Sequence, residues 1–171
     1  MVRALPDDGN RYEVVDGELL VAPAPSVRHQ RAVGMIYFDL TTYARATGAG
    51  ETFYSPAVIS TREDRLVQPD LFVVSRTLGR VKQWPDVTHL LLAVEVLSPS
   101  TARADRLVKR RLYAEIADEY WIVDLDARLI ERWRPGDARP EIITDRLVWQ
   151  PADAEPFEFD LPQYFAKVNA E

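Results

Sequence analysis

A charged residue lies in the middle of a segment that otherwise has the pattern of a buried strand. The segment LLLAVEVL, residues 90–97, is apolar at every position except Glu95. An ionised carboxylate is stable in such surroundings only when it is paired with a cation, protonated or bound to a metal ion. The fold must therefore bring a partner to Glu95.

The preceding strand-like segment carries a second carboxylate in similar surroundings. Within residues 64–75, Asp70 follows Pro69 and is succeeded by an apolar run. Two carboxylates on adjacent strands repel one another unless a cation lies between them. Magnesium is typically held by one or two carboxylates and keeps its other positions for water and phosphate. The pair therefore predicts a Mg²⁺ or Mn²⁺ site, to which Glu18 could add a third carboxylate.

The remaining segments indicate a mixed α/β order. Asp16-Gly17 suits a tight turn between apolar runs, so residues 11–23 are expected to form a hairpin. Apolar residues three or four positions apart predict helices over 27–47 and 101–117. The other predicted elements are strands at 51–60, 64–75 and 89–97, a hairpin around Asp126-Ala127, a weaker strand pair over 139–150 and a helix at 161–168.

The size and composition of the chain limit its class. Its 171 residues, 47% of them hydrophobic, are sufficient for one core, and we expect a single domain over residues 1–171. The absence of cysteine excludes disulfides, thiolate zinc sites and cysteine nucleophiles. We find neither an apolar signal core at the N-terminus nor a membrane-spanning apolar run, and expect a cytoplasmic protein with no membrane partner. Four aromatic residues are expected in the core: Tyr120, Trp121, Trp133 and Trp149.

One segment of this acidic chain is strongly basic. The net charge of −6 argues against a surface that binds nucleic acid throughout, but RADRLVKRR, residues 103–111, carries five basic residues and one Asp. A solvated helix face is one interpretation of this segment. The other is a set of phosphate contacts made by Arg103, Arg106, Arg110 and Arg111.

The same segment contains a lysine that can be assigned in two ways. Asp105, Lys109 and Tyr113 are four residues apart, so they lie along one ridge of the predicted helix. Lys109 can form a simple ion pair with Asp105, or it can extend over the end of the strand that carries Glu95.

Three stretches resemble a known family: VQPDLFVV, LLAVEVLSPSTARADRLVKRRLY and EYWIVD. They are similar to the bacterial restriction-endonuclease-like family, formerly a domain of unknown function, in the PD-(D/E)XK nuclease superfamily. The resemblance runs from YEVVDGELL to RWRP, most of the chain. It implies a central mixed β-sheet flanked by helices, with additional hairpins, and an endonuclease that cleaves nucleic acid. Double-stranded DNA is the expected substrate, and a homodimer is compatible with the resemblance.

The resemblance also implies roles for particular residues. Asp70 and Glu95 would bind the divalent metal ion, and a lysine would assist phosphodiester cleavage. The superfamily usually places this lysine two residues after the second acid, where this chain has Leu97. The family places a lysine in the following helix instead, and Lys109 matches that position.

Two further residues are implied as members of the site. Glu18 matches the family's DGE stretch as a metal ligand, and His29, within SVRHQ, matches a histidine of the active-site surroundings. A solvated residue after the turn and an ordinary hydrogen-bonded core histidine are the alternatives. At the level of function, the alternatives are a nuclease-like scaffold that binds nucleic acid or protein without cutting, and a hydrolase of another phosphodiester.

Overall fold

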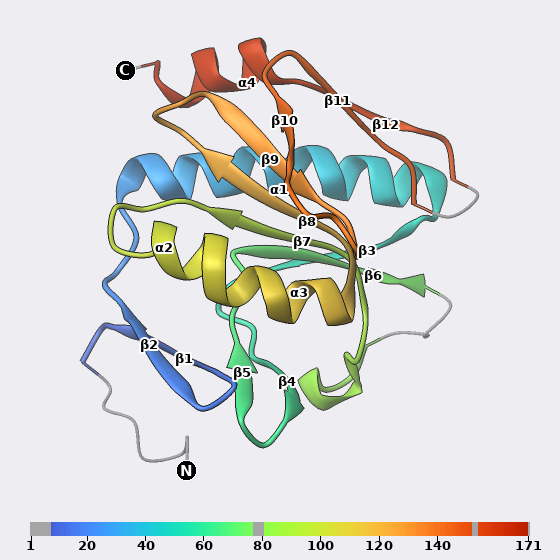
Figure 1. The fold of residues 1–171 in the computed structure, drawn as a ribbon. Coiled ribbons are helices and arrows are strands. Elements are labelled where there is room, and N and C mark those ends of the chain that lie inside the picture. Colours follow the sequence, from blue (N-terminus) through green and yellow to red (C-terminus); the bar gives the residue numbers. More distant parts are fainter. Residues whose placement is uncertain (1–7, 77–80, 152–153, 171) are drawn as a thin grey trace.

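A six-stranded mixed sheet forms the centre of the computed structural model, which describes residues 8–76, 81–151 and 154–170 (Figure 1). Its strands, in spatial order, are β10 (Glu141–Ile143), β9 (Leu129–Trp133), β8 (Ala117–Asp124), β7 (Leu90–Val96), β6 (Leu71–Ser75) and β3 (Gly50–Tyr54). Strands β7 and β8 are parallel, and the other neighbours are antiparallel. The helical segment between β7 and β8 provides the crossover that a parallel pair requires.

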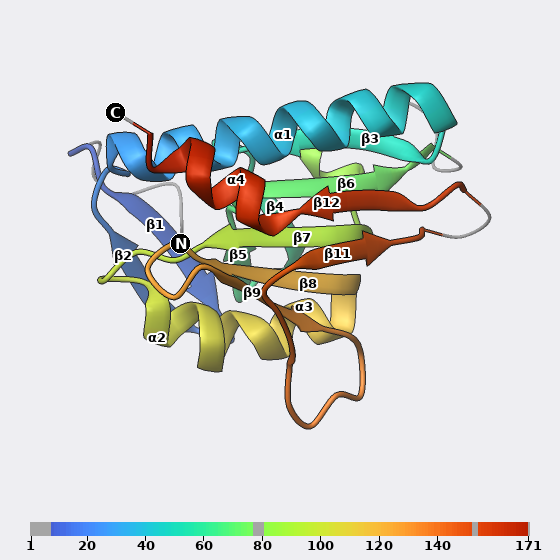
Figure 2. The ribbon, with the colours of Figure 1, turned by 90° about the horizontal axis from the view of Figure 1, so that it is seen from above.

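Helices cover both faces of this sheet (Figure 2). On one face lies α1 (Val27–Thr47); on the other lies a continuous helical segment made of α2 (Ala102–Ala104), η4 (Asp105–Lys109) and α3 (Arg110–Ile116). Because both faces are covered, the central strand β7 is apolar along its whole length apart from Glu95. Side chains alternate along a strand, so Glu95 points away from α1 and toward the second helical segment.

A second, four-stranded sheet lies beside that helical segment (Figure 1). Its strands, in spatial order, are β2 (Glu18–Ala22), β1 (Arg11–Val15), β5 (Arg65–Val67) and β4 (Ile59–Arg62). The predicted hairpin around Asp16-Gly17 is confirmed, and both turn residues have positive φ, 50° and 82°. This sheet supplies one side of the site described below.

The C-terminal part of the chain packs over α1. It consists of the two-stranded sheet of β11 (Arg146–Trp149) and β12 (Phe157–Asp160), followed by α4 (Leu161–Val168). Trp121 and Trp149 are buried in the core that α1 and α4 share, and Tyr120 is buried on the opposite face of the central sheet. The prediction that these three residues belong to the core is confirmed, whereas Trp133 is only partly buried.

Three predicted strand segments are divided differently in the structure. The segment 51–60 forms β3 and β4, and the segment 64–75 forms β5 and β6, so each contributes to both sheets. The pair predicted over 139–150 is wrong, because β10 pairs with β9 and β11 pairs with β12. Local patterns identified strands here, but distant residues supplied their partners. A short helical turn, η3 (Trp84–Asp86), completes the elements of the described chain.

Candidate active site

The two predicted carboxylates lie side by side at the junction of β6 and β7. The antiparallel register pairs Leu71 with Val94, which places Asp70 beside Glu95. The backbone N–H of Val96 donates to Asp70 Oδ2 at 2.9 Å. Both carboxylates are almost completely buried, with 3% of Asp70 and 1% of Glu95 exposed. The strand register thus produces the buried acidic pair that the sequence predicts.

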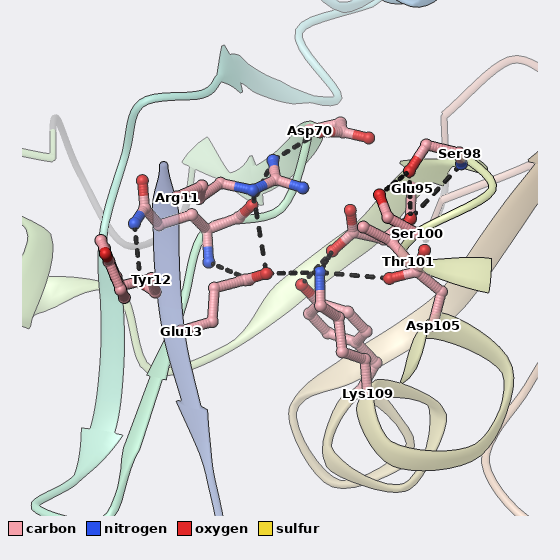
Figure 3. Close-up of polar contacts among 12 residues, drawn as sticks. Arg11, Tyr12, Glu13, Asp70, Glu95, Ser98, Ser100, Thr101, Asp105 and Lys109 are labelled. Carbon is pink, nitrogen blue, oxygen red and sulfur yellow. Dashed lines mark hydrogen bonds and ion pairs between the residues drawn. The ribbon is translucent and has the colours of Figure 1, made fainter. Parts of the chain in front are cut away.

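Asp70 uses both of its oxygen atoms. Arg11 Nη1 lies 2.7 Å from Oδ1, and His29 Nε2 lies 3.1 Å from Oδ2 (Figure 3 shows the arginine contact). Burial alone would raise the pKa of Asp70, but the His29 hydrogen bond and the Arg11 charge outweigh it and hold this pKa far below its usual range. Asp70 therefore remains ionised.

His29 comes from the first turn of α1. The Ser26 hydroxyl caps the helix by accepting a hydrogen bond from the His29 backbone N–H at 3.2 Å. His29 Nε2 lies 3.1 Å from Asp70 Oδ2 and 3.0 Å from the carbonyl oxygen of Val96. The predicted auxiliary histidine thus joins the N-terminus of α1 to the acidic pair.

Glu95 has a different environment from Asp70. Its Oε1 accepts hydrogen bonds from Lys109 Nζ and from the Tyr113 hydroxyl, both at 3.0 Å. Burial raises the pKa of Glu95 well above its usual value, Lys109 opposes this shift, and the negative charges of Asp70 and Asp105 add to it. In the absence of a further cation, Glu95 tends to keep a proton.

Lys109 is bound by three carboxylates from three different elements (Figure 3). Its Nζ lies 2.7 Å from Glu13 Oε2, 3.0 Å from Glu95 Oε1 and 3.2 Å from Asp105 Oδ1. Burial opposes the positive charge, but the three carboxylates outweigh it and raise the pKa of Lys109. Both predicted contacts of Lys109 are formed, because it pairs with Asp105 on its own helical segment and also with Glu95 on β7.

A π-helical segment positions these groups. Residues Asp105–Lys109 form η4, a π-helix within the helical segment that follows β7. Such wider turns are rare and occur frequently at functional sites. Here Asp105 and Lys109 are both buried, although they belong to a strongly basic segment. The remaining basic side chains are thereby distributed around the other faces of the helix.

The structure does not bring Glu18 to this cluster. Glu18 is exposed at the beginning of β2, beside the turn, so its predicted role as a metal ligand has no support in this arrangement. Strand β1 instead supplies Glu13, which is buried and also accepts a hydrogen bond from the Gln68 backbone N–H at 2.8 Å. Arg11 and Glu13 were not predicted, although their spacing of two residues places them on one strand face. That spacing was the available signal.

The four arginines expected at phosphates separate into two kinds. Arg106 pairs with Asp124 and Glu131 at 2.9 and 2.6 Å, and Arg110 lies 4.4 Å from the centre of the Trp133 ring. These two side chains are already engaged with the protein. The other two, Arg103 and Arg111, are exposed. None of the four is among the described residues that line the cleft beside Asp70.

That cleft has a volume of about 640 Å³ and opens beside Asp70, Arg11 and His29. The first residues of α1 and the loop before α2 form part of its wall. Three hydroxyl side chains of this loop lie together, with the Ser98 hydroxyl oxygen 3.0 Å from those of both Ser100 and Thr101 (Figure 3). Helix N-termini and hydroxyl groups are common partners of phosphate. Glu95 and Lys109 are buried behind this surface.

The cluster contains more negative than positive groups. Four buried carboxylates meet two cations, namely Glu13, Asp70, Glu95 and Asp105 against Arg11 and Lys109. When all six groups are ionised, two negative charges are unbalanced. The two cations occupy carboxylate oxygens, and in the described part of the chain no three His, Cys, Asp or Glu side chains form a ready-made metal site.

The donor chemistry beside the cleft nevertheless suits a divalent cation. A carboxylate oxygen of Asp70 and the carbonyl oxygen of Val96 both lie within 3.1 Å of the same nitrogen of His29. Carboxylate and carbonyl oxygens are the ligands that Mg²⁺ and Mn²⁺ favour. One divalent ion would also balance the two excess charges. The Asp70 carboxylate and the Val96 carbonyl oxygen therefore fit the chemistry of such a site, and Glu95 is the neighbouring carboxylate on β7.

A mixed sheet between two helical layers, with an acidic pair on adjacent central strands, defines a restriction-endonuclease-like fold. Residues 2–163 match the Uma2 family, which carries the description "Putative restriction endonuclease", and the chain belongs to this family. Among solved structures, it is similar to a "putative nuclease belonging to DUF820" from Anabaena variabilis, with 15% identity and a TM-score of 0.78. The match covers 98% of this chain and 96% of the other.

A search of the curated proteins finds no match to this chain. Among the described residues, no helix combines the length and the apolar character that crossing a membrane would require.

Proposed function

We propose that this protein is a Mg²⁺- or Mn²⁺-dependent endonuclease that hydrolyses phosphodiester bonds in DNA, with double-stranded DNA as its substrate. The observation that supports this proposal best is the gathering of four buried carboxylates against two cations around Asp70 and Glu95, directly beside the cleft. Buried carboxylates placed close together repel one another, and a bound cation removes this repulsion. Membership of the family supports the nuclease class.

In this proposal, each part of the site has a separate task. Asp70 and Glu95 would hold the metal ion, which when bound polarises the phosphate and lowers the pKa of the attacking water. Lys109 holds Glu95 in place and offsets part of the acidic charge. The hydroxyl groups of Ser98, Ser100 and Thr101, at the wall of the cleft, would orient the phosphate.

A second candidate is a nuclease-like scaffold that binds nucleic acid without cutting it. The position of Lys109 favours this alternative, because its side chain is 1% exposed and its ammonium contacts three carboxylates and does not line the cleft. A lysine that stabilises charge on the substrate must reach the reacting phosphate. The two candidates therefore differ in whether Lys109 and Glu95 become accessible when metal and DNA bind.

Cleavage and metal binding, measured on the same variants, test the proposal. Labelled duplex DNA is incubated with wild type, Asp70→Asn and Glu95→Gln in Mg²⁺, in Mn²⁺ and in EDTA, and Mn²⁺ binding is measured by electron paramagnetic resonance. We expect metal-dependent cleavage by wild type only, with weakened Mn²⁺ binding in both variants and unchanged behaviour in the Glu18→Gln control. Mn²⁺ binding without cleavage would favour the scaffold, and gel filtration with and without DNA would test for a homodimer.

A further inference from the structure

Arg11 lies between the acidic pair and the cleft. Its Nη1 contacts Asp70 Oδ1 at 2.7 Å and the Gln68 carbonyl oxygen at 3.3 Å, and its Nε lies 3.8 Å from Glu13 Oε2. The Arg11 side chain is 22% exposed, whereas that of Asp70 is 3% exposed. Among the described residues that line the cleft, Arg11 is the only lysine or arginine. It is therefore the one permanent positive charge in the described wall of the cleft.

The contacts of Asp70 set a condition for metal binding. Arg11 occupies Oδ1 (Figure 3), while His29 and the Val96 N–H occupy Oδ2. A divalent cation that binds Asp70 must share Oδ1 with the Arg11 guanidinium or Oδ2 with His29 and the Val96 N–H, and in either case it lies close to the guanidinium on the same carboxylate. Two cations at one carboxylate repel each other, and the repulsion is weakly screened because the carboxylate is buried. Metal binding therefore weakens the contact between Arg11 and Asp70.

A displaced guanidinium has a suitable partner nearby. Arg11 belongs to β1 and already faces the cleft, so its side chain can turn toward the cleft without any change in the strand. A guanidinium binds phosphate oxygens through two parallel hydrogen bonds, which makes it a better phosphate ligand than a point charge. A DNA phosphate beside Asp70 would be within its range.

We propose that Arg11 alternates between two partners: it is the counter-ion of Asp70 in the metal-free protein, and it binds the substrate phosphate once the metal ion is in place. This inference rests on the proposed metal-dependent function. The alternation couples metal binding to phosphate binding. Metal binding releases Arg11 for the phosphate, and phosphate binding withdraws Arg11 from Asp70, the metal ligand. By linkage, each ligand raises the affinity for the other by the same factor.

Arg11→Met tests the inference, because it keeps an unbranched side chain and removes the charge. Mn²⁺ affinity without DNA is measured by electron paramagnetic resonance, and affinity for a fluorescein-labelled phosphorothioate duplex is measured with and without Mn²⁺. Removing the competing cation should tighten Mn²⁺ binding by roughly tenfold. Removing the phosphate ligand should weaken DNA binding in Mn²⁺ by roughly tenfold, and the coupling factor should fall from at least about fivefold toward one.

Two variants serve as references. Arg28→Met removes an arginine that pairs with Asp126 rather than with Asp70, and it should leave Mn²⁺ affinity and the coupling factor unchanged. Arg11→Lys keeps a positive charge and should retain part of the coupling. It also provides the measurement if Arg11→Met lowers the melting temperature strongly.

The outcomes separate this inference from the proposed function. If Asp70→Asn lowers the Mn²⁺ affinity but Arg11→Met leaves it unchanged or weakened, the alternation of Arg11 is wrong and the metal site stands. Opposite changes in the two affinities would support the inference even if wild type cuts no DNA, since neither measurement requires turnover. If Asp70→Asn binds Mn²⁺ as wild type does, the inference and the proposed metal site both fail.

Discussion

Glu13 Oε2 lies 2.7 Å from Lys109 Nζ, and this buried ion pair connects the small sheet to the helix that follows β7. The same ammonium contacts Glu95 in the central sheet and Asp105 on its own helical segment. One lysine thereby joins three parts of the fold at the candidate active site. Changes at this point should alter both stability and metal binding.

Replacement of Glu13 should show how strongly the small sheet depends on this connection. Glu13→Ala removes one partner of Lys109 and leaves the Gln68 backbone N–H without its acceptor. A hydrogen bond to a charged group contributes about 1.5–3 kcal/mol, so we expect the free energy of unfolding to fall by about 2–4 kcal/mol in urea denaturation. Glu18→Ala, on the same hairpin but exposed, should change it by less than about 0.5 kcal/mol. Equal effects of the two variants would contradict the structure.

The protonation of Glu95 should appear in the pH dependence of stability. Its pKa is raised in the folded protein, so above the unfolded value of about 4.3 the folded state holds more protons than the unfolded state. Wild-type stability then decreases as the pH rises, by up to about 1.4 kcal/mol per pH unit from this group. Glu95→Gln lacks this loss.

Urea denaturation in EDTA between pH 4 and pH 8 measures this effect. Glu95→Gln should become increasingly more stable than wild type toward pH 8, and the difference should disappear near pH 4. If wild type instead gains stability relative to the variant as the pH rises, the attraction of Lys109 outweighs burial and the assigned direction of the pKa shift is wrong.

The arginines of the basic helix should separate into a structural and a DNA-binding pair. Arg103 and Arg111 are exposed, so replacing both by Ala should weaken DNA binding and reduce the salt slope by about 0.9 for each lost phosphate contact. Arg106 and Arg110 contact the protein, so their double replacement should lower stability by about 1–2 kcal/mol with little change in the slope. Salt titrations of DNA binding and urea denaturation measure the two effects, and identical slopes for both double variants would remove this distinction.

The sequence was most informative where one element determines the outcome. Helical periodicity predicted residues 27–47 as one helix, and the structure has α1 over this range. The apolar surroundings of Asp70 and Glu95 predicted an acidic pair on neighbouring strands, because side-chain alternation and strand pairing follow from local pattern. These inferences required no knowledge of how the small sheet packs.

The sequence was least informative where burial depends on contacts between distant segments. Glu13 and Glu18 lie on the same hairpin, and only the packing of β1 against the helix of Lys109 determines which carboxylate is buried. Likewise, Arg106 has a structural role because it forms ion pairs with Asp124 and Glu131. Both of these carboxylates lie on strands further along the chain, β8 and β9. A local charge count could not distinguish these cases.

Lys109→Met is the strongest test of the charge balance at the site. It leaves the carboxylates of Glu13, Glu95 and Asp105 buried without their shared cation. Breaking a buried ion pair costs about 3–5 kcal/mol, so thermal melts in EDTA at pH 8 should show a large loss of stability. The loss should be smaller at pH 5, because Glu95 and Asp105 have raised pKa values and take up protons as the pH falls.

Mn²⁺ should raise the melting temperature of the variant more than that of wild type, since it supplies the missing charge. Lys167→Met, which removes a lysine whose ammonium donates to the exposed Gln163, should respond to Mn²⁺ as wild type does and show no added loss of stability toward pH 8. If Lys109→Met melts like wild type at pH 8 and gains no extra stability from Mn²⁺, the three carboxylates do not depend on this lysine, and the charge argument for the metal site loses its basis.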